Sequence, residues 1–267
     1  MSFLSPVYGI VVRDLLRSLR QRGRLLGGLV RPLMWLVLVG TGFNAIAQVG
    51  GGVTYQQFVY PGIIVMAQLF GAMLMAISTV YDREFGSLRL MLASPAGLGA
   101  VLTGRVLAAT LIGMLQGGVV LALAPFFLPS SVRQMLAAAA ALGLAALVSS
   151  VLGLTIAARL RSVENFAGVI NVVLFPLLFV SGALYPAERM PPLLGFLARA
   201  NPVTYQVDLM RHALNQEAQF SASLDILVLC LVALLLFAVA RMLFDPEQRF
   251  IGRPRHDSLA RGEAEPG

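Results

Sequence analysis

Long apolar runs, separated by short polar segments, make up most of this chain. Six of the runs approach the roughly 20 residues that a helix needs to cross a bilayer. They hold almost no charge, and this favours helices over the alternating pattern of a membrane barrel. The predicted spans are Pro32–Gln48, Phe58–Val80, Leu102–Leu123, Met135–Ala158, Phe166–Leu184 and Leu224–Leu243.

The composition supports this reading of the pattern. Of the 267 residues, 58% are hydrophobic and only 12% are charged, whereas soluble domains average about 25% charged residues. A soluble fold of this composition would expose more apolar surface than water tolerates. We therefore expect an all-α polytopic membrane protein whose surroundings are a lipid bilayer.

An amphipathic helix is predicted over residues 5–24, ahead of the first span. Its apolar side chains recur at helical spacing, and four charged side chains occupy the other face. This pattern is typical of a helix that lies in the membrane interface with its arginines toward anionic headgroups; a plain cytoplasmic helix is the alternative. The apolar face comprises Tyr8, Val11, Val12, Leu15, Leu16 and Leu19, and the charged face Arg13, Asp14, Arg17 and Arg20.

The arginines predict the orientation in the membrane, because cytoplasmic loops carry an excess of basic residues. If the N-terminus is cytoplasmic, only four of the twenty arginines fall on the outer side. Those four are Arg133, Arg189, Arg199 and Arg211. Both termini are therefore predicted to be cytoplasmic, and the net charge of +7 faces the membrane rather than a nucleic acid.

A charged insert, D-R-E-F-G-S-L-R-L-M-L-A-S-P, joins the second and third spans. Phe85, Leu88, Met91 and Leu92 follow helical spacing, and Pro95 ends the pattern. The insert predicts a short amphipathic helix over residues 82–94. Such a helix either lies on the membrane surface or docks on a soluble partner, and we favour docking.

The segment after the fifth span is rich in proline and too interrupted to cross the membrane again. It is apolar enough to return into the outer leaflet, so we expect two short re-entrant or interfacial helices, broken near Asn201 and Pro202. A simple loop is the alternative, but the run P-L-L-G-F-L would then expose apolar side chains to water. Residues 246–267 form a polar tail that is expected to be disordered.

Several chemistries are excluded or disfavoured by the residues present. All twenty basic residues are arginines, and a phosphate-binding P-loop requires a lysine, so this chain carries no such ATPase and we expect no catalytic residue. His212 and His256 are the only histidines, which disfavours a metal site. The single cysteine, Cys230, is expected to be a small buried side chain. No carboxylate lies at the centre of a span, and this argues against an ion-coupled carrier.

Three features together resemble the membrane permease of type-2 ATP-binding-cassette exporters, a class that covers drug, polysaccharide and lipo-oligosaccharide export. The first is the charged insert D-R-E-F-G-S-L-R-L-M-L-A-S-P. The second is the exit F-P-L-L-F-V-S-G-A-L-Y-P, followed by N-P-V-T-Y and Arg211. The third is the interfacial N-terminal helix. The resemblance covers residues 1–245, which would form one transmembrane domain.

The resemblance implies an assembly of two permeases, as a homodimer or heterodimer, with two separate ATP-binding subunits in a bacterial inner membrane. Those subunits would bind ATP and Mg, so no cofactor is expected in this chain. The insert would be the coupling helix, with Glu84 and Arg89 in polar contacts and Phe85, Leu88 and Leu92 in buried contacts with the ATPase. The full set of implied coupling residues is Asp82, Arg83, Glu84, Phe85, Gly86, Ser87, Leu88, Arg89 and Leu92.

The resemblance also implies a translocation path along the first and fifth spans at the interface between the two permeases. Candidate path residues are Thr41, Asn44, Asn171, Phe175 and Phe179, and the external re-entrant motif comprises Pro186, Asn201, Pro202 and Tyr205. The spans show no charge for recognising cargo, which favours an amphipathic, lipid-like, drug-like or glycan substrate. The alternative functions are an ion-coupled secondary transporter and a non-transporting membrane assembly factor of similar topology.

Overall fold

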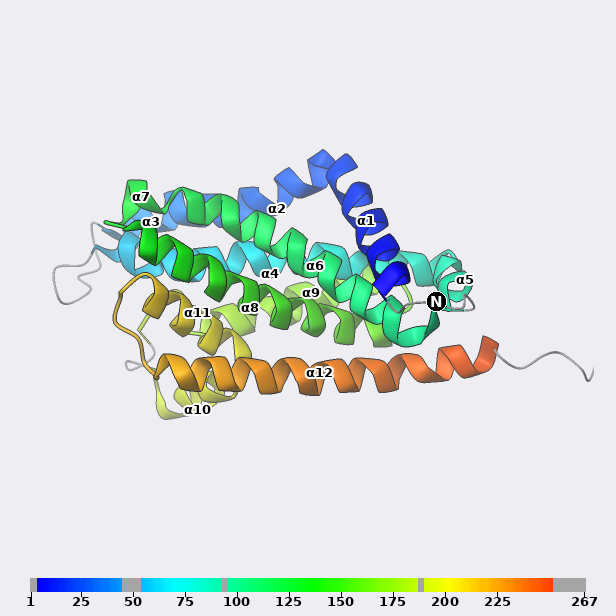
Figure 1. Cartoon of the computed structure of the whole chain (residues 1–267). Helices are drawn as coiled ribbons and strands as arrows, with labels where there is room; N and C mark the ends of the chain where they lie inside the picture. The colour runs from blue at the N-terminus through cyan, green and yellow to red at the C-terminus, as the bar shows by residue number, and fades with distance from the viewer. Residues whose placement is uncertain (1–3, 45–53, 93–95, 187–189, 252–267) are drawn as a thin grey trace, which may run out of the picture.

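A computed structural model of the chain describes residues 4–44, 54–92, 96–186 and 190–251, without the side chains of residues 44 and 245–251. Within these ranges the chain forms helices joined by turns, and no strand occurs among them. Figure 1 shows the helices arranged as an elongated bundle. The elements are α1 (Leu4–Arg20), α2 (Arg22–Met34), the π-helix η1 (Trp35–Val39), α3 (Gly40–Asn44), α4 (Tyr55–Glu84), α5 (Ser87–Leu92), α6 (Gly97–Ala122), α7 (Ala124–Phe127), α8 (Val132–Arg159), α9 (Val163–Val180), α10 (Pro192–Ala200), α11 (Pro202–Ala213) and α12 (Ala222–Ile251).

Six helical segments in the described residues are long and apolar enough to cross a membrane, which confirms the predicted fold class. Five of them lie over the predicted spans. The first differs at its start: α2, η1 and α3 form one segment over Arg22–Phe43, whereas the sequence predicted a start at Pro32. Arg24, predicted at the end of the interfacial helix, and Arg31, predicted ahead of the first span, therefore both belong to this membrane helix.

Helix α4 forms the centre of the bundle and packs against α6 and α8. In its most apolar stretch 89% of the residues are buried, against 17% for the first segment, 22% for α9 and 17% for α12. A capping box at Thr54 satisfies the first amide groups of α4. Gly71 lets α6 approach closely, because a Cβ there would lie 3.1 Å from the Cα of Gly113. The first segment, α9 and α12 form the periphery.

The bundle has two distinct ends, which we name the α5 end and the α11 end after the helices found there (Figure 1). The beginning of α1 and the C-terminal end of α12 both lie at the α5 end. The two described chain ends are thus on one side of the bundle. That this side is cytoplasmic stays a prediction.

Helix α1 packs across α6 with a different face from the one that the sequence predicted. Asp14, assigned to the headgroup face, is buried with 1% of its surface exposed, whereas Tyr8, assigned to the apolar face, is 72% exposed. Leu16 and Leu19 are also exposed. Part of the charged face therefore turns into the protein, where other charged residues meet it, and half of the predicted apolar face is exposed.

Two short helices follow α9, as predicted, with the break between α10 and α11 at Asn201. Helix α11 packs deep against the bundle. Gln68, near the middle of α4, donates from Nε2 to Gln206 of α11 at 3.0 Å and to Ser149 of α8 at 3.1 Å. The first turns of α11 thus reach the mid-level of α4, although their depth in a membrane stays a prediction.

Helix α12 differs from the sequence prediction in two ways. It continues through Ile251, so residues 246–251 belong to a helix rather than to the expected tail; residues 252–267 lie outside the described part of the chain. Cys230, expected to be buried, is exposed on α12. An exposed apolar face on α12 suits contact with lipid, where a thiol is tolerated like any small apolar side chain.

Candidate functional site

A buried carboxylate at the α5 end organises the predicted coupling region. Asp82 lies in the last turn of α4 and is 4% exposed. It accepts hydrogen bonds from Arg17 at 2.9 Å, from Arg13 at 3.3 Å and from Arg105, which makes the closest contact. We call Asp82, Arg13, Arg17 and Arg105 the Asp82 cluster. It joins α1, α4 and α6 through one side chain.

Arg105 is the buried member of the Asp82 cluster, with 4% of its surface exposed. The sequence placed it near the start of the third span, predicted from Leu102; α6 begins earlier, at Gly97, and carries Arg105 inside the helix. It also donates to Thr79 of α4 at 3.2 Å. A buried guanidinium is costly without a partner of opposite charge, so Asp82 and Arg105 stabilise each other's buried charge.

The next two residues bind the end of α4 to other helices. Arg83 donates to the carbonyl of Leu160, at 2.6 Å, and to that of Ala157, both at the end of α8. Its guanidinium also lies 5.0 Å from the ring centroid of Phe244 in α12. Glu84 accepts from the amide of Val163, at 3.2 Å, where α9 begins. The last turn of α4 is therefore attached to α1, α6, α8, α9 and α12.

Helix α5 projects beyond this attachment point. Gly86, at φ 78°, turns the chain after α4, since a left-handed residue without a Cβ is unstrained there. Leu88 and Leu92 are 1% and 3% exposed and pack within the chain, while Phe85 and Leu90 are 75% and 76% exposed.

The predicted coupling residues thus fall into two groups. Asp82, Arg83, Leu88 and Leu92 make contacts inside the chain, so they are not available to a partner in this conformation. The residues on the outer surface are Glu84, Phe85, Arg89 and the unpredicted Leu90. The expected helix also differs in extent: residues 82–84 end α4, α5 covers Ser87–Leu92, and residues 93–94 lie outside the described ranges.

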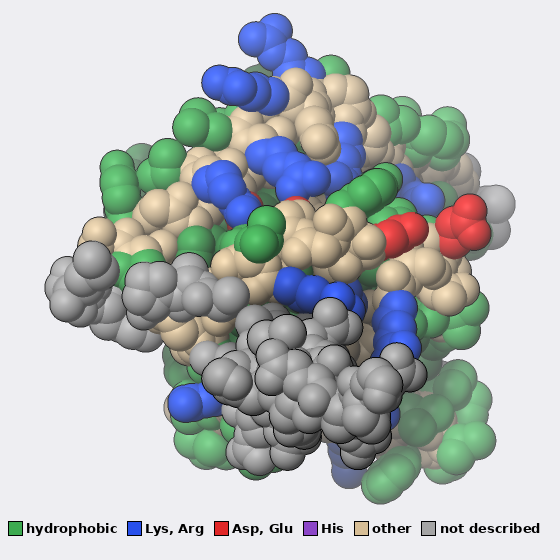
Figure 2. Space-filling view, turned by 90° about the vertical axis from the view of Figure 1, so that its right-hand side faces the viewer, with side chains coloured by type: hydrophobic (Ala, Val, Ile, Leu, Met, Phe, Trp, Pro, Cys, Tyr) green, Lys and Arg blue, Asp and Glu red, His purple; other side chains and the backbone are tan. Residues whose placement is uncertain are grey.

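Figure 2 views the molecule from the α5 end and shows arginine side chains gathered over it. Several of these arginines are exposed on α1, on α5 and just beyond α8. The surface is therefore positive and would attract anionic headgroups or an acidic protein surface. Its exposed arginines include Arg13, Arg17, Arg89, Arg159 and Arg161.

A groove of about 260 Å³ opens between the first membrane segment, α4 and α9. Arg24 and Arg31 of α2 line it, facing Phe70 of α4 and Asn171 of α9. Arg24 donates to the carbonyl of Leu74 at 2.6 Å. The guanidinium of Arg31 lies 4.8 Å from the ring centroid of Phe70, a cation–π distance. The groove is both cationic and aromatic.

The structure brings some of the predicted path residues together. Asn171 lines the groove, while Phe175 and Phe179, further along α9, line a narrow crevice of about 10 Å³ with Trp35 of η1. Thr41 is exposed, donates to the carbonyl of Val37 and lines neither cavity. Asn44 lies at the end of α3, and its side chain is outside the described part of the structure.

Sequence reasoning missed Arg24, Arg31 and η1 as parts of this region. Arg24 was predicted to end the interfacial helix and Arg31 to precede the first span, although the apolar residues between them, such as Leu29 and Val30, were a signal of a continuing helix. The π-helix over Trp35–Val39 has no sequence signature that we recognise. Such π-helical turns occur frequently at functional sites, and this one places Trp35 edge-on to Phe179, with centroids 6.1 Å apart.

The predicted external motif holds the two short helices in place. Asn201 caps α11 by accepting from the amide of Val203 at 2.9 Å, and its side-chain amide donates to the carbonyl of Leu177 of α9 at 2.6 Å. Tyr205 donates to the carbonyl of Arg199 in α10 at 2.7 Å. The two prolines flank these contacts: Pro202 is the first residue of α11, and Pro186 lies in the loop after α9.

This geometry defines a class: a multi-pass helical membrane protein with a short exposed helix attached to several of its spans. The profile of the "ABC-2 type transporter" family matches residues 7–215. The chain therefore belongs to the ABC-2 type transporter family, as a membrane permease subunit and not an enzyme, which confirms the resemblance seen in the sequence.

Individual relatives agree with this assignment. The chain is 29% identical to the transport permease ycf38 of Porphyra purpurea, over 88% of this chain and 84% of the relative. It is 28% identical to nodulation protein J of Rhizobium leguminosarum bv. trifolii, over 70% of this chain and 72% of that protein. It is 27% identical to the inner membrane transport permease YadH of Escherichia coli K12, over 60% of this chain and 63% of that protein.

Proposed function

We propose that this chain is the membrane half of an exporter driven by ATP hydrolysis on a separate subunit. The observation that carries the proposal is the attachment of α5 to the bundle. Phe85, Arg89 and Leu90 are exposed at the tip, while Asp82 and Arg83 directly behind them contact four other helices or helix ends. A force applied to the tip therefore reaches most of the bundle.

The ATP-binding partner would supply that force. All twenty basic residues of this chain are arginines, so a lysine-containing phosphate loop must lie on another subunit. ATP and Mg would bind there. Binding of ATP changes the partner's shape, and it shifts the permease only if the partner contacts its two states differently. The exposed tip of α5 is the surface on which that difference would act.

A second permease copy would cover the face formed by the first segment and α9. That face exposes Arg24, Arg31 and Asn171 along the groove, and polar groups at membrane depth avoid lipid. Helix α12 differs, because most of its exposed residues between Leu224 and Ala240 are apolar and suit lipid contact. They include Leu227, Leu231, Leu234 and Leu235.

The residues that line the groove also indicate the chemical class of the cargo. The guanidinium of Arg31 beside Phe70 and Phe175, with Arg24 also lining the groove, suits an amphipathic molecule with a polar or anionic part and an apolar part. The sequence predicted no charge for cargo recognition, but Arg24 and Arg31 provide one within the first membrane helix. We place the assembly in a bacterial inner membrane, with the α5 end in the cytoplasm.

The test is co-purification of the affinity-tagged permease with the ATP-binding subunit encoded beside it, from membranes that contain both. We expect Phe85→Ala and Leu90→Ala to reduce the recovered ATPase severalfold, because they remove the exposed apolar tip. Phe126→Ala is the matched control, since Phe126 is 82% exposed on α7, and it should leave recovery unchanged. Equal recovery from all three variants would contradict the docking role of α5.

Transport measurements separate this proposal from an ion-coupled carrier. Vesicles containing the assembly should move cargo only with ATP, and an ionophore that collapses ion gradients should not stop them. Transport that needs the gradient and ignores ATP would indicate a carrier instead. An absence of cargo movement under both conditions would favour an assembly factor.

A further inference from the structure

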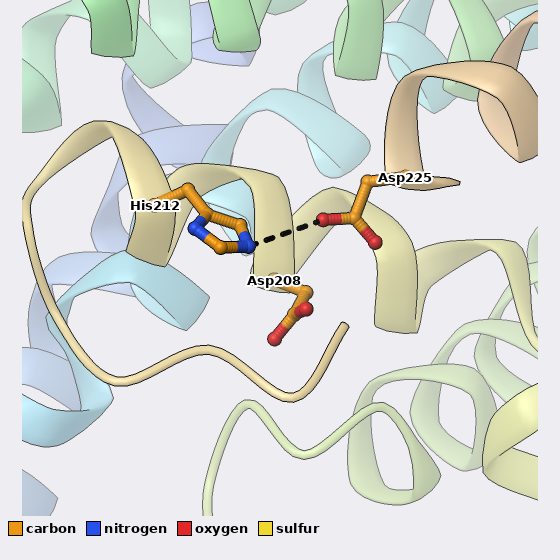
Figure 3. Close-up of side chains that lie close together, drawn as sticks. All are labelled: Asp208, His212 and Asp225. Atoms are coloured by element: carbon orange, nitrogen blue, oxygen red, sulfur yellow. Dashed lines mark ion pairs between the residues drawn. The ribbon is translucent and has the colours of Figure 1, made fainter. Parts of the chain in front are cut away.

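A second cluster of charged side chains lies at the α11 end, opposite α5. Asp208 and His212 are one helical turn apart on α11 and share a face, and Asp225 lies in the first turn of α12. Figure 3 shows the three side chains converging from the two helices. One potential ligand atom from each lies within 4.8 Å of the other two.

Asp225 is the unusual member of this cluster. It is 0% exposed, and neither of its carboxylate oxygens has a hydrogen-bond partner among the described residues. Its nearest ionisable neighbour within ion-pair distance is His212, whose Nε2 lies 3.9 Å from Oδ2. A buried carboxylate without hydrogen bonds is costly in free energy. A positive charge between α11 and α12 would therefore stabilise Asp225.

The two neighbours are already oriented toward the same point. Asp208 is 3% exposed and accepts from the amides of Gln219 and Phe220, both at 2.7 Å. These bonds fix the carboxylate and leave lone pairs for a further ligand. His212 Nε2 lies 2.7 Å from the carbonyl oxygen of Phe220 and donates to it. An ion would displace the proton from Nε2, and the freed carbonyl oxygen would be a potential fourth ligand. The side chain of His212 is 33% exposed, which gives access from solvent.

We propose that Asp208, His212 and Asp225 bind one divalent transition-metal ion, with Zn²⁺ the best match. One imidazole nitrogen and two carboxylates form a known type of zinc ligand set, whereas Mg²⁺ and Ca²⁺ favour oxygen ligands alone. In a tetrahedral zinc site the ligand atoms are about 3.4 Å apart. The observed spacing therefore needs only small side-chain movements to close around an ion.

Such an ion would neutralise the two buried carboxylates and connect α11 to the start of α12. The sequence predicted no metal site, because it holds two histidines and neither lies in a ligand motif. The site depends instead on residues of two helices that the turn after α11 brings together. It does not depend on the ATPase partner, so it can be tested with the permease alone.

The experiment uses the full-length chain in detergent micelles with a histidine-free affinity tag. The protein is stripped with a chelator, which is then removed, and is equilibrated with Zn²⁺, Mn²⁺ or Mg²⁺ before bound metal is measured by mass spectrometry. We expect about one zinc per chain and little magnesium. Asp225→Asn and His212→Gln should weaken zinc binding about 100-fold or more, since loss of an outer-shell partner alone costs 10–100-fold.

Glu217→Gln is the matched control, because Glu217 is an exposed carboxylate in the connection between α11 and α12; it should bind zinc like the parent. Far-UV circular dichroism checks that each variant is folded, and if Asp225→Asn is not, His212→Gln decides. Bound Co²⁺ provides a second readout, since its visible spectrum should lose intensity in His212→Gln. Equal zinc binding by the parent and the two ligand variants, or none by the parent, would overturn the proposal and leave an ion pair between His212 and Asp225.

Discussion

Asp82 and Asp225 are both buried carboxylates of the same chain, at opposite ends of the bundle. Asp82 is contacted by Arg13, Arg17 and Arg105, whereas Asp225 has one histidine at 3.9 Å and no hydrogen bond among the described residues. Burial alone therefore says little about what a carboxylate does. The charge of Asp82 is balanced by arginines of the chain, whereas Asp225 has no arginine within ion-pair distance among the described residues, so a cation from solution can supply its counter-charge.

The largest expected effect comes from removing the charge of Asp82. In Asp82→Asn the buried Arg105 loses its counter-ion, so we expect a loss of about 3–5 kcal/mol in the free energy of unfolding. Thermal and chemical unfolding in detergent would measure it. Glu84→Gln is the control: Glu84 is an exposed carboxylate with one described hydrogen bond, and its replacement should cost about 1 kcal/mol or less. Similar losses for both would show that the cluster is not structural.

The second prediction compares two arginines that contact the same carboxylate. The side chain of Arg105 is 3% exposed and that of Arg17 is 43% exposed. Arg105→Gln should therefore cost about 3 kcal/mol, because Asp82 stays buried and loses its closest partner. Arg17→Gln should cost about 1 kcal/mol or less, since exposed ion pairs contribute little. The same unfolding assay checks both, and a larger loss for Arg17→Gln would reverse our reading of the cluster.

The third prediction is that loss of the Asp225 carboxylate changes the free energy of unfolding in the opposite direction from loss of the Asp82 carboxylate. In the presence of a chelator, Asp225→Asn should raise the free energy of unfolding by about 1 kcal/mol, because it removes a buried charge without hydrogen bonds. Added Zn²⁺ should then stabilise the parent, by about 2.7 kcal/mol at a hundredfold excess over the dissociation constant, and not the variant. A loss of stability in the chelated variant would show that Asp225 has a favourable partner within the protein.

The smallest effect on stability is expected at the tip of α5. Phe85→Ala should change the free energy of unfolding by less than about 0.5 kcal/mol, because the ring is 75% exposed. Leu88→Ala, three residues along and 1% exposed, should cost about 2–5 kcal/mol. Unfolding measurements on the isolated permease would test the contrast. A large loss for Phe85→Ala would mean that its effect on ATPase recovery reflects damaged folding and not docking.

Hydropathy and helical spacing predicted the six spans, the N-terminal helix and the two short helices after α9, because lipid contact imposes long apolar runs. They failed where a charge is satisfied by tertiary contacts. Arg24 was predicted to end the interfacial helix, before the first span, but it lies within the first membrane segment and donates to the carbonyl of Leu74. Single-sequence reasoning has no access to this partner, so the first span was predicted to start too late.

The short helix of the candidate site was predicted, but the face that it buries was not. The insert was recognised, yet Leu88 and Leu92 were assigned to the partner when they pack within the chain. Helical spacing identifies an apolar face without saying what covers it. The cluster of Asp208, His212 and Asp225 could not be predicted, because the turn after α11 determines which residues of α12 meet α11.

The exposure of Cys230 gives the molecule one natural attachment point for a spectroscopic label. It is the single cysteine of the chain, so a thiol-reactive spin probe would report from the outer face of α12 alone, with no background to remove. In an assembly of two copies, a pair of such probes would report the distance between the two permease subunits. Pulsed resonance measurements could then follow each stage of the nucleotide cycle without any engineered residue.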